Sequence, residues 1–181
     1  MDTLAHGLWG GAAFSHKDGQ WKWAFVLGMA PDLLSFGPFF LMRLGDISRR
    51  WTAGRMGPPE AHTIPEFVYH AYNITHSLLV WVAMFLVALY FLSLRKRTPL
   101  LRYSDTSLPL LPFLAWPLHI LCDIPTHSTR FFPTPFLWPF PTTFFNGTSW
   151  GNKTFMIANY SAIAVAYLGY FLWKRRTRKP D

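Results

Sequence analysis

The apolar positions of this chain fall into long stretches that are separated by short polar segments. The clearest stretch covers residues 78–94 and is followed at once by basic residues at 95–97, and another covers residues 155–173 and is followed by Lys174, Arg175 and Arg176. At about 1.5 Å per residue, a helix over 78–94 is about 26 Å long, close to the thickness of the hydrocarbon layer of a bilayer. Both stretches therefore predict transmembrane helices. The positive-inside rule places their C-terminal ends, and with them the C-terminus of the chain, in the cytoplasm.

Two further apolar stretches contain proline. Residues 108–122 include Pro109, Pro112 and Pro117, and residues 21–42 include Pro31. Membrane helices tolerate proline where neighbouring groups satisfy the freed carbonyls.

Residues 3–14 are rich in glycine and alanine, which predicts a short helix packed closely on a neighbour. We expect an all-α integral membrane protein with about four transmembrane helices plus a short N-terminal membrane helix, in one domain over residues 1–181 that includes a loop at 43–70.

The segment 128–154 differs from the rest because aromatic residues and prolines dominate it. Its prolines exclude a long helix, and its aromatic rings suit the membrane–water interface. We expect a Phe/Pro-rich extracytoplasmic loop here. Two interpretations stay open, a packed loop and a lid that touches substrate.

Composition supports the membrane interpretation. Charged residues make up 14% of the chain, well below the quarter that is usual in soluble domains. The net charge of +8 would suggest a nucleic-acid partner in a soluble protein. Here the basic residues lie mostly at the ends of apolar stretches, so we expect membrane lipids and no nucleic acid as partners. The single cysteine, Cys122, excludes an intrachain disulfide.

Ionisable residues inside apolar stretches are costly and usually mark a functional site. Imidazole and carboxylate groups are ligands for zinc and similar divalent ions, and a bound metal offsets the cost of burying them. A lone buried histidine is often only hydrogen-bonded to a carbonyl, and an aspartate after a proline can cap a helix. Together, the residues at such positions favour a shared metal site instead: His6, Asp32, His76, His119 and Asp123.

The spacing of these residues predicts that they converge. His6 and Asp32 are each thirteen residues from Gly19, the expected turn of a helical hairpin, so they lie at one height. His76 and Asp123 are almost equally distant from a second turn near residues 98–99, and His119 shares a helix face with Asp123. In this topology His76 opens its helix at the outer surface. A tilted helix or a deep cavity is then needed to bring the two pairs together.

Four strings occur in order along the chain: His6-Gly7, the run 28–32, Thr75-His76-Ser77-Leu78 and the run 119–123, with an aromatic-proline segment at 136–140. This series resembles the LexA-regulated family of inner-membrane metal-dependent hydrolases. The resemblance implies a helical membrane protein, in the bacterial inner membrane, whose His and Asp residues bind a divalent metal. The implied ligands are the five residues above. Many members have His-Arg-Gly where this chain has Ala71, Tyr72 and Asn73.

A looser likeness exists to zinc-dependent phospholipase C, an all-helical enzyme with a His-x-x-x-Asp pair and a later His. Here His119, Asp123 and His127 follow that pattern, although Pro125 interrupts the helix on which it depends.

We therefore expect a hydrolase that uses one or two divalent metals, with zinc the first choice, at the extracytoplasmic face. A phospholipid or another phosphate- or ester-containing lipid is the expected substrate. His127 and Arg130 follow the last ligands, and either could protonate a leaving group or hold an anionic substrate; Arg130 could equally be an interfacial anchor. Two other classes stay open: a small transporter or ion-pathway protein that uses buried His and Asp, and a non-catalytic scaffold with a structural metal.

Overall fold

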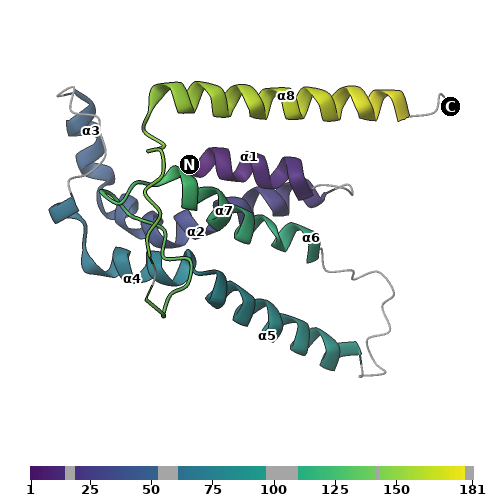
Figure 1. Ribbon diagram of the computed structural model, residues 1–181, viewed down its shortest axis with the longest axis horizontal. Coiled ribbons are helices and arrows are strands. Elements are labelled where there is room, and N and C mark those ends of the chain that lie inside the picture. The colour runs from purple at the N-terminus through teal and green to yellow at the C-terminus, as the bar shows by residue number, and fades with distance from the viewer. Residues whose placement is uncertain (15–18, 53–60, 97–109, 142, 178–181) are drawn as a thin grey trace.

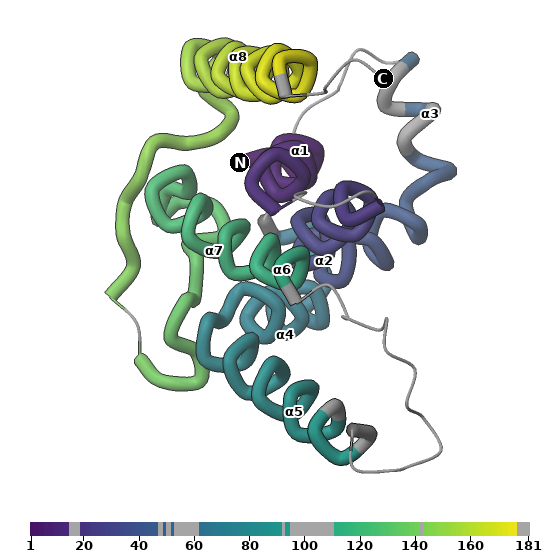
Figure 2. Tube along the Cα trace, turned by 90° about the vertical axis from the view of Figure 1, so that its right-hand side faces the viewer, coloured from purple at the N-terminus to yellow at the C-terminus, as the bar shows by residue number. Residues whose placement is uncertain are grey.

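The computed structural model describes residues 1–14, 19–52, 61–96, 110–141 and 143–177, and their regular structure is entirely helical. In Figures 1 and 2, α8 lies along one side of the molecule, and α4 and α5 lie along the other. Between them lie α1, α2, α6 and α7. The expectation of an all-α chain is confirmed for these residues. The elements are α1 (Thr3–Phe14), α2 (Gln20–Met42), α3 (Leu44–Thr52), η1 (Ala61–Thr63), α4 (Glu66–Thr75), α5 (Leu78–Lys96), α6 (Leu110–Phe113), α7 (Ala115–Thr126) and α8 (Lys153–Thr177).

Two helices, α2 and α8, are long and apolar enough to cross a membrane. They correspond to the spans predicted at 21–42 and 155–173. A third candidate consists of α4 and the first part of α5, which are bent by 61° at a short break. The α5 helix covers the span predicted at 78–94. Two spans are therefore supported, or three if the bent pair counts as one.

The fourth predicted span, at 108–122, is not confirmed as a single helix. Residues 108–109 lie outside the described part of the chain, and the rest is divided into α6 and α7 by a turn at Leu114. Pro117 has no N–H and cannot donate to the carbonyl four residues earlier, which favours a break in the helix at this place. Neither piece is long enough to cross a bilayer alone.

The predicted loop at 43–70 contains α3, η1 and the first part of α4; residues 53–60 lie outside the described residues. The α4 helix follows Pro65, which is extended at the N-cap, and carries Glu66 in its first turn. Proline near a helix start and an acid in the first turn both favour a helix here. The consequence concerns His76. It lies at the break between α4 and α5, directly before the helix that covers the predicted span at 78–94.

The α1–α2 hairpin is packed as closely as its glycines predict. A Cβ atom added at Gly28 would lie 2.6 Å from the carbonyl oxygen of His6, and one added at Gly10 would lie 2.6 Å from that of Ala24. The hydroxyl of Thr3 donates to Asp32 Oδ2 at 2.7 Å. Asp32 therefore lies opposite Thr3, about one helical turn from the predicted position opposite His6.

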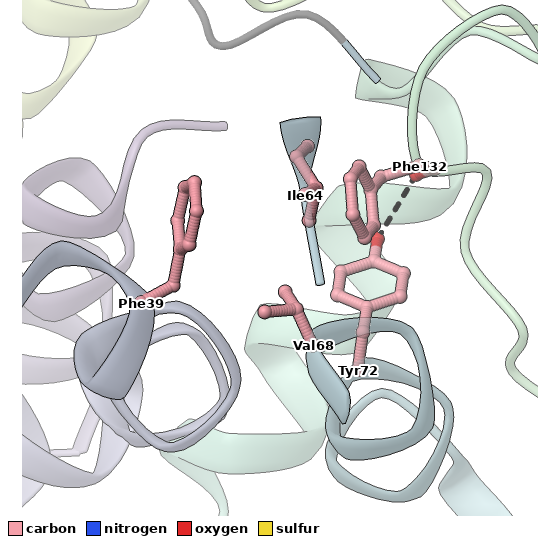
Figure 3. Close-up of a cluster of buried hydrophobic side chains, with 5 residues drawn as sticks. All are labelled: Phe39, Ile64, Val68, Tyr72 and Phe132. Carbon is pink, nitrogen blue, oxygen red and sulfur yellow. Dashed lines mark hydrogen bonds between the residues drawn. The ribbon is translucent and has the colours of Figure 1, made fainter. Parts of the chain in front are cut away.

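The aromatic loop is a packed structure. Phe132 lies in a buried cluster with Phe39, Ile64, Val68 and Tyr72, and so joins α2, the segment between η1 and α4, and α4 (Figure 3). Farther along, the loop is bonded to the start of α5, because Leu78 N donates to Phe136 O at 2.9 Å and the Ser77 hydroxyl donates to Trp138 O at 2.6 Å.

The end of the aromatic loop is bonded to the C-terminal end of α7. Gly147 N donates to His127 O at 2.8 Å, Thr148 N to Pro125 O at 2.9 Å and Trp150 N to Thr126 O at 3.0 Å. A Cβ atom at Gly147 would lie 2.1 Å from Pro125 O, so only glycine allows this approach. The loop thereby covers the end of the helix that carries His119 and Asp123.

Replacement of Gly28 by Ala is expected to destabilise the protein by about 1–3 kcal/mol, because the new methyl group overlaps the His6 carbonyl and must push α1 away from α2. The thermal unfolding temperature of the purified protein in detergent measures this. Gly169→Ala is the matched control, since a Cβ atom there meets nothing within 4 Å. Equal unfolding temperatures for the two variants would show that the close packing of the hairpin is unimportant.

Candidate metal centre

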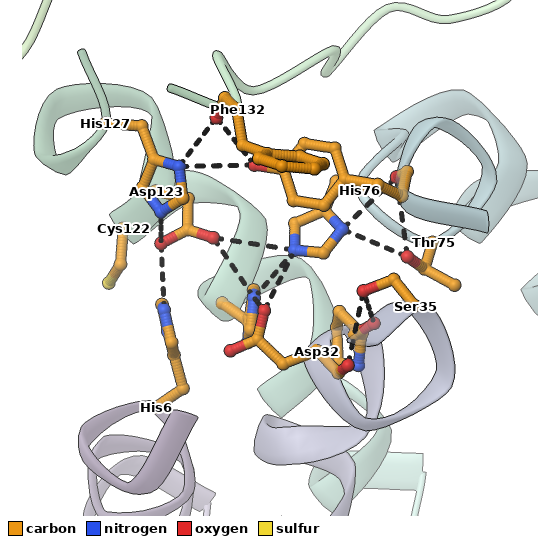
Figure 4. A network of polar contacts seen from close by, with 12 residues as sticks. His6, Asp32, Ser35, Thr75, His76, Cys122, Asp123, His127 and Phe132 are labelled. Atoms are coloured by element: carbon orange, nitrogen blue, oxygen red, sulfur yellow. Dashed lines mark hydrogen bonds and ion pairs between the residues drawn. The ribbon is translucent and has the colours of Figure 1, made fainter. Parts of the chain in front are cut away.

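Five predicted ligands, which come from four parts of the chain, meet in one buried cluster (Figure 4). His6 comes from α1, Asp32 from α2, His76 from the α4–α5 break, and His119 and Asp123 from one face of α7. His76 and Asp123 are 0% exposed and Asp32 is 9% exposed. His76 lies at the 61° bend between α4 and α5, and from there its Nε2 reaches Asp32 of α2 and His119 of α7.

Four of these residues form the tightest group. Asp32, His76, His119 and Asp123 each offer one nitrogen or oxygen atom, and these atoms all lie within 4.8 Å of one another. His76 Nε2 lies 3.1 Å from His119 Nε2 and 3.4 Å from Asp32 Oδ1. His119 Nε2 lies 3.1 Å from Asp123 Oδ2. Two imidazole nitrogens and two carboxylates thus face a common point.

Hydrogen bonds on the far side of each ring determine which nitrogen carries the proton. His119 Nδ1 donates to the Gly28 carbonyl at 2.7 Å, and His76 Nδ1 donates to the Tyr72 carbonyl at 3.2 Å. A carbonyl only accepts hydrogen bonds, so in the neutral rings Nδ1 holds the proton and Nε2 presents a lone pair. This is the arrangement in which protein histidines usually bind a metal.

The outer oxygens of the two carboxylates are engaged, Asp32 Oδ2 by the Thr3 hydroxyl and Asp123 Oδ1 by the Met1 amino group, whereas the side that faces His76 and His119 carries acceptor atoms. Asp123 Oδ2 is buried and has no hydrogen-bond partner among the described residues. Buried carboxylates are stable only when they are paired or coordinate a metal. Two neutral imidazoles and two carboxylates also match the ligands that zinc and related divalent ions accept. The residues present thus fit a divalent cation.

His6 is part of the cluster but is not one of the four convergent ligands. Its Nε2 lies 2.8 Å from Asp123 Oδ1, the carboxylate oxygen that points away from His76 and His119. Its ring stacks on that of His119, with 3.5 Å between the ring centroids. In this geometry His6 orients the Asp123 carboxylate and the His119 ring.

His127 also approaches Asp123 Oδ1, with its Nε2 at 3.3 Å. Its Nδ1 donates to the Phe132 carbonyl at 2.7 Å, so the aromatic loop orients the ring. The amino group of Met1 lies 2.5 Å from the same oxygen. Arg130, by contrast, is exposed and is not among the residues that line the cavity beside the cluster.

Some residues that position the ligands were not predicted. The Tyr72 ring stacks on His76 with centroids 3.8 Å apart, and its hydroxyl donates to Phe132 O at 3.1 Å. The Trp116 indole N–H donates to the Thr75 carbonyl at 2.9 Å and joins α7 to the end of α4. The spacing of four residues between Tyr72 and His76 was a usable signal, because it places both on one helix face.

A cavity of about 340 Å³ reaches the cluster. Asp32 and His127 are among the residues that line it. The cluster therefore has a side that a small molecule can approach, which a fully enclosed structural metal site does not have.

Comparisons with protein-family models, with curated proteins and with solved structures find no match to this chain. The resemblance to the LexA-regulated hydrolases therefore stays a prediction that depends on the four residue strings.

The variant Asp123→Asn is expected to lose divalent metal. It keeps the shape of the side chain but removes the charge that faces His76 and His119. Loss of a group that only orients a ligand weakens metal binding about 10–100-fold, so loss of a carboxylate ligand should weaken it more. Elemental analysis after purification and competitive titration with a chelator measure this. Asp46→Asn, at an exposed position on α3, is the control.

Proposed function

We propose that this chain is a membrane-bound, metal-dependent hydrolase whose metal centre consists of Asp32, His76, His119 and Asp123. One observation carries the proposal: four potential ligand atoms from three parts of the chain, α2, the α4–α5 break and α7, lie within 4.8 Å of one another and could together hold a metal ion. The cavity beside them supports a catalytic over a purely structural role, because catalytic metal sites keep a position open for water or substrate. Zinc is the proposed metal, since its usual ligands include His and Asp.

A divalent ion held by these residues would supply a water of lowered pKa and would polarise the bond to be cleaved. The chain's own groups carry the rest of the chemistry. His6 keeps the Asp123 carboxylate in place through its bond to Oδ1. His127 lines the cavity and has its Nδ1 engaged by the Phe132 carbonyl, and its Nε2, which lies 3.3 Å from Asp123 Oδ1, is the atom that we propose exchanges a proton with the reacting molecule.

The arrangement of the helices supports an extracytoplasmic site. The α8 helix ends in Lys174, Arg175 and Arg176. The cavity is lined by Trp150, which precedes α8, and so lies toward the opposite end of that helix. With the basic end in the cytoplasm of a bacterial inner membrane, the cavity opens near the outer surface, where membrane lipids are the proposed substrates.

The orientation is tested with reporter fusions. An enzyme that is active only outside the cytoplasm, fused after Asp181, is expected to be inactive, and one that is active only in the cytoplasm is expected to be active. The reverse pattern would place the cavity on the cytoplasmic side and would remove the extracytoplasmic part of the proposal.

The variant His127→Gln is expected to lower the turnover number about 10²–10⁴-fold, the usual contribution of a general acid or base, while the metal content stays within twofold of wild type. The assay uses vesicles of radiolabelled phospholipids and a soluble nitrophenyl ester, with and without chelator. His70→Gln, at an exposed position, is the matched control and should leave turnover unchanged.

A wild-type protein without stoichiometric divalent metal under any loading condition would end the hydrolase proposal. Metal flux into proteoliposomes without turnover of any substrate would indicate a transporter instead. A metal that is present but inert in both assays would indicate a structural site.

A further inference from the structure

The lining of the cavity beside the metal centre is mostly apolar, with a few polar residues. Asp2, Thr3, Asp32 and His127 are the polar ones. Leu33, Phe36 and Phe40 of α2 line the remainder, together with Phe131 and Phe132 of the aromatic loop. No lysine or arginine is among the lining residues, although the chain as a whole carries a net charge of +8.

The apolar part follows one face of a helix. Asp32, Phe36 and Phe40 are four residues apart, so they lie above one another along α2. From Asp32 to Phe40 the helix rises by about 12 Å. The lining residues of α2 thus extend over about 12 Å, from the candidate metal ligand Asp32 to the ring of Phe40.

The open side of the cavity lies on a membrane helix. Phe40 is 50% exposed and Leu33 is 47% exposed, and both belong to α2, one of the two helices long and apolar enough to cross a bilayer. Side chains that are apolar and exposed on such a helix face lipid. A ligand that moves within the bilayer can thus enter the cavity from the side.

Gly37 keeps this cavity open. It lies within α2 and lines the cavity, and a Cβ atom added there would meet nothing within 4 Å. Glycine inside a helix is less stable than alanine, so close packing or backbone strain would be the usual reason for it. Neither applies here, because the space beside Gly37 is cavity.

We propose that this cavity binds a single acyl chain of a membrane lipid, with the reacting group at Asp32 and His127 and the chain along Leu33, Phe36 and Phe40. Gly37 sets the length of chain that fits. The volume of about 340 Å³ is near the lower limit for ligand pockets, which suits one chain and excludes a complete two-chain lipid. The inference depends on the proposed function only for the reacting group; binding of the chain requires no hydrolysis.

The test is photolabelling with fatty acids that carry a diazirine near the methyl end, on purified wild-type protein in detergent. Label is expected mainly on the peptide that contains residues 33–40 and the peptide that contains residues 131–132. Unlabelled palmitate should compete for both. Label spread evenly over α2, α5 and α8 would show only general contact with apolar surface and would overturn the proposal.

Variants at Gly37 test the chain-length claim. Gly37→Leu fills part of the cavity, and each methylene that it excludes should weaken binding about fourfold. Competition by palmitate should therefore weaken by more than about tenfold, while competition by octanoate should change little. Gly37→Ala should weaken competition by palmitate relative to octanoate in the same way but to a smaller extent. It replaces Gly37→Leu as the test if the leucine variant does not fold.

Gly169→Leu is the matched control, because Gly169 lies inside α8, also has open space beside it and is not among the cavity-lining residues. Equal loss of competition by palmitate in the Gly37→Leu and Gly169→Leu variants would overturn the proposal. These experiments measure binding of the acyl chain alone. They can therefore support the acyl-chain site when the assays show no hydrolysis, and they can exclude that site when the assays show hydrolysis.

Discussion

The burial of two carboxylates at one point is the constraint on which this structure depends. Asp32 and Asp123 are held in a water-poor interior, where an uncompensated negative charge is far more costly than on the surface. The imidazoles of His76 and His119 present lone pairs to the same point, since backbone carbonyls engage their other nitrogens. Those carbonyls belong to Tyr72 and Gly28. The helices that supply them must therefore lie close enough to touch the rings, which explains the glycines of the α1–α2 hairpin and the docking of α7 against both α2 and the end of α4.

The sequence predicted much of the cluster because burial of charge is visible in a sequence. His6, Asp32, His76, His119 and Asp123 stand out as ionisable residues in apolar surroundings, and all of them lie in the cluster. The spacing argument also placed His119 and Asp123 correctly on one helix face. It could not predict that His6 contacts Asp123 Oδ1, the oxygen that points away from His76 and His119. That contact depends on how α1 is rotated about its own axis, and the packing of α1 against its neighbours determines this rotation.

The differences between the predicted spans and the observed helices have local physical causes. Mean apolarity over residues 108–122 indicates a span, but Pro117 removes a helical hydrogen bond and the helix divides at Leu114. The segment before His76 is polar enough to resemble a loop, yet Pro65 and Glu66 start a helix there. That helix places His76 at the break between α4 and α5, where its Nε2 lies 3.4 Å from Asp32 Oδ1 and 3.6 Å from Asp123 Oδ2. The two predicted His/Asp pairs thus meet in the fold.

The last helix supplies none of the four convergent ligands, yet it is bonded to the helix that carries His6. Tyr160 donates to Asp2 at 2.9 Å, Tyr167 donates to the Leu8 carbonyl at 2.9 Å, and Trp9 donates to Asn159 at 3.0 Å. During synthesis every ligand leaves the ribosome before α8 does. The bonds that join α8 to α1 can therefore form only after all four residues of the candidate centre have been synthesised.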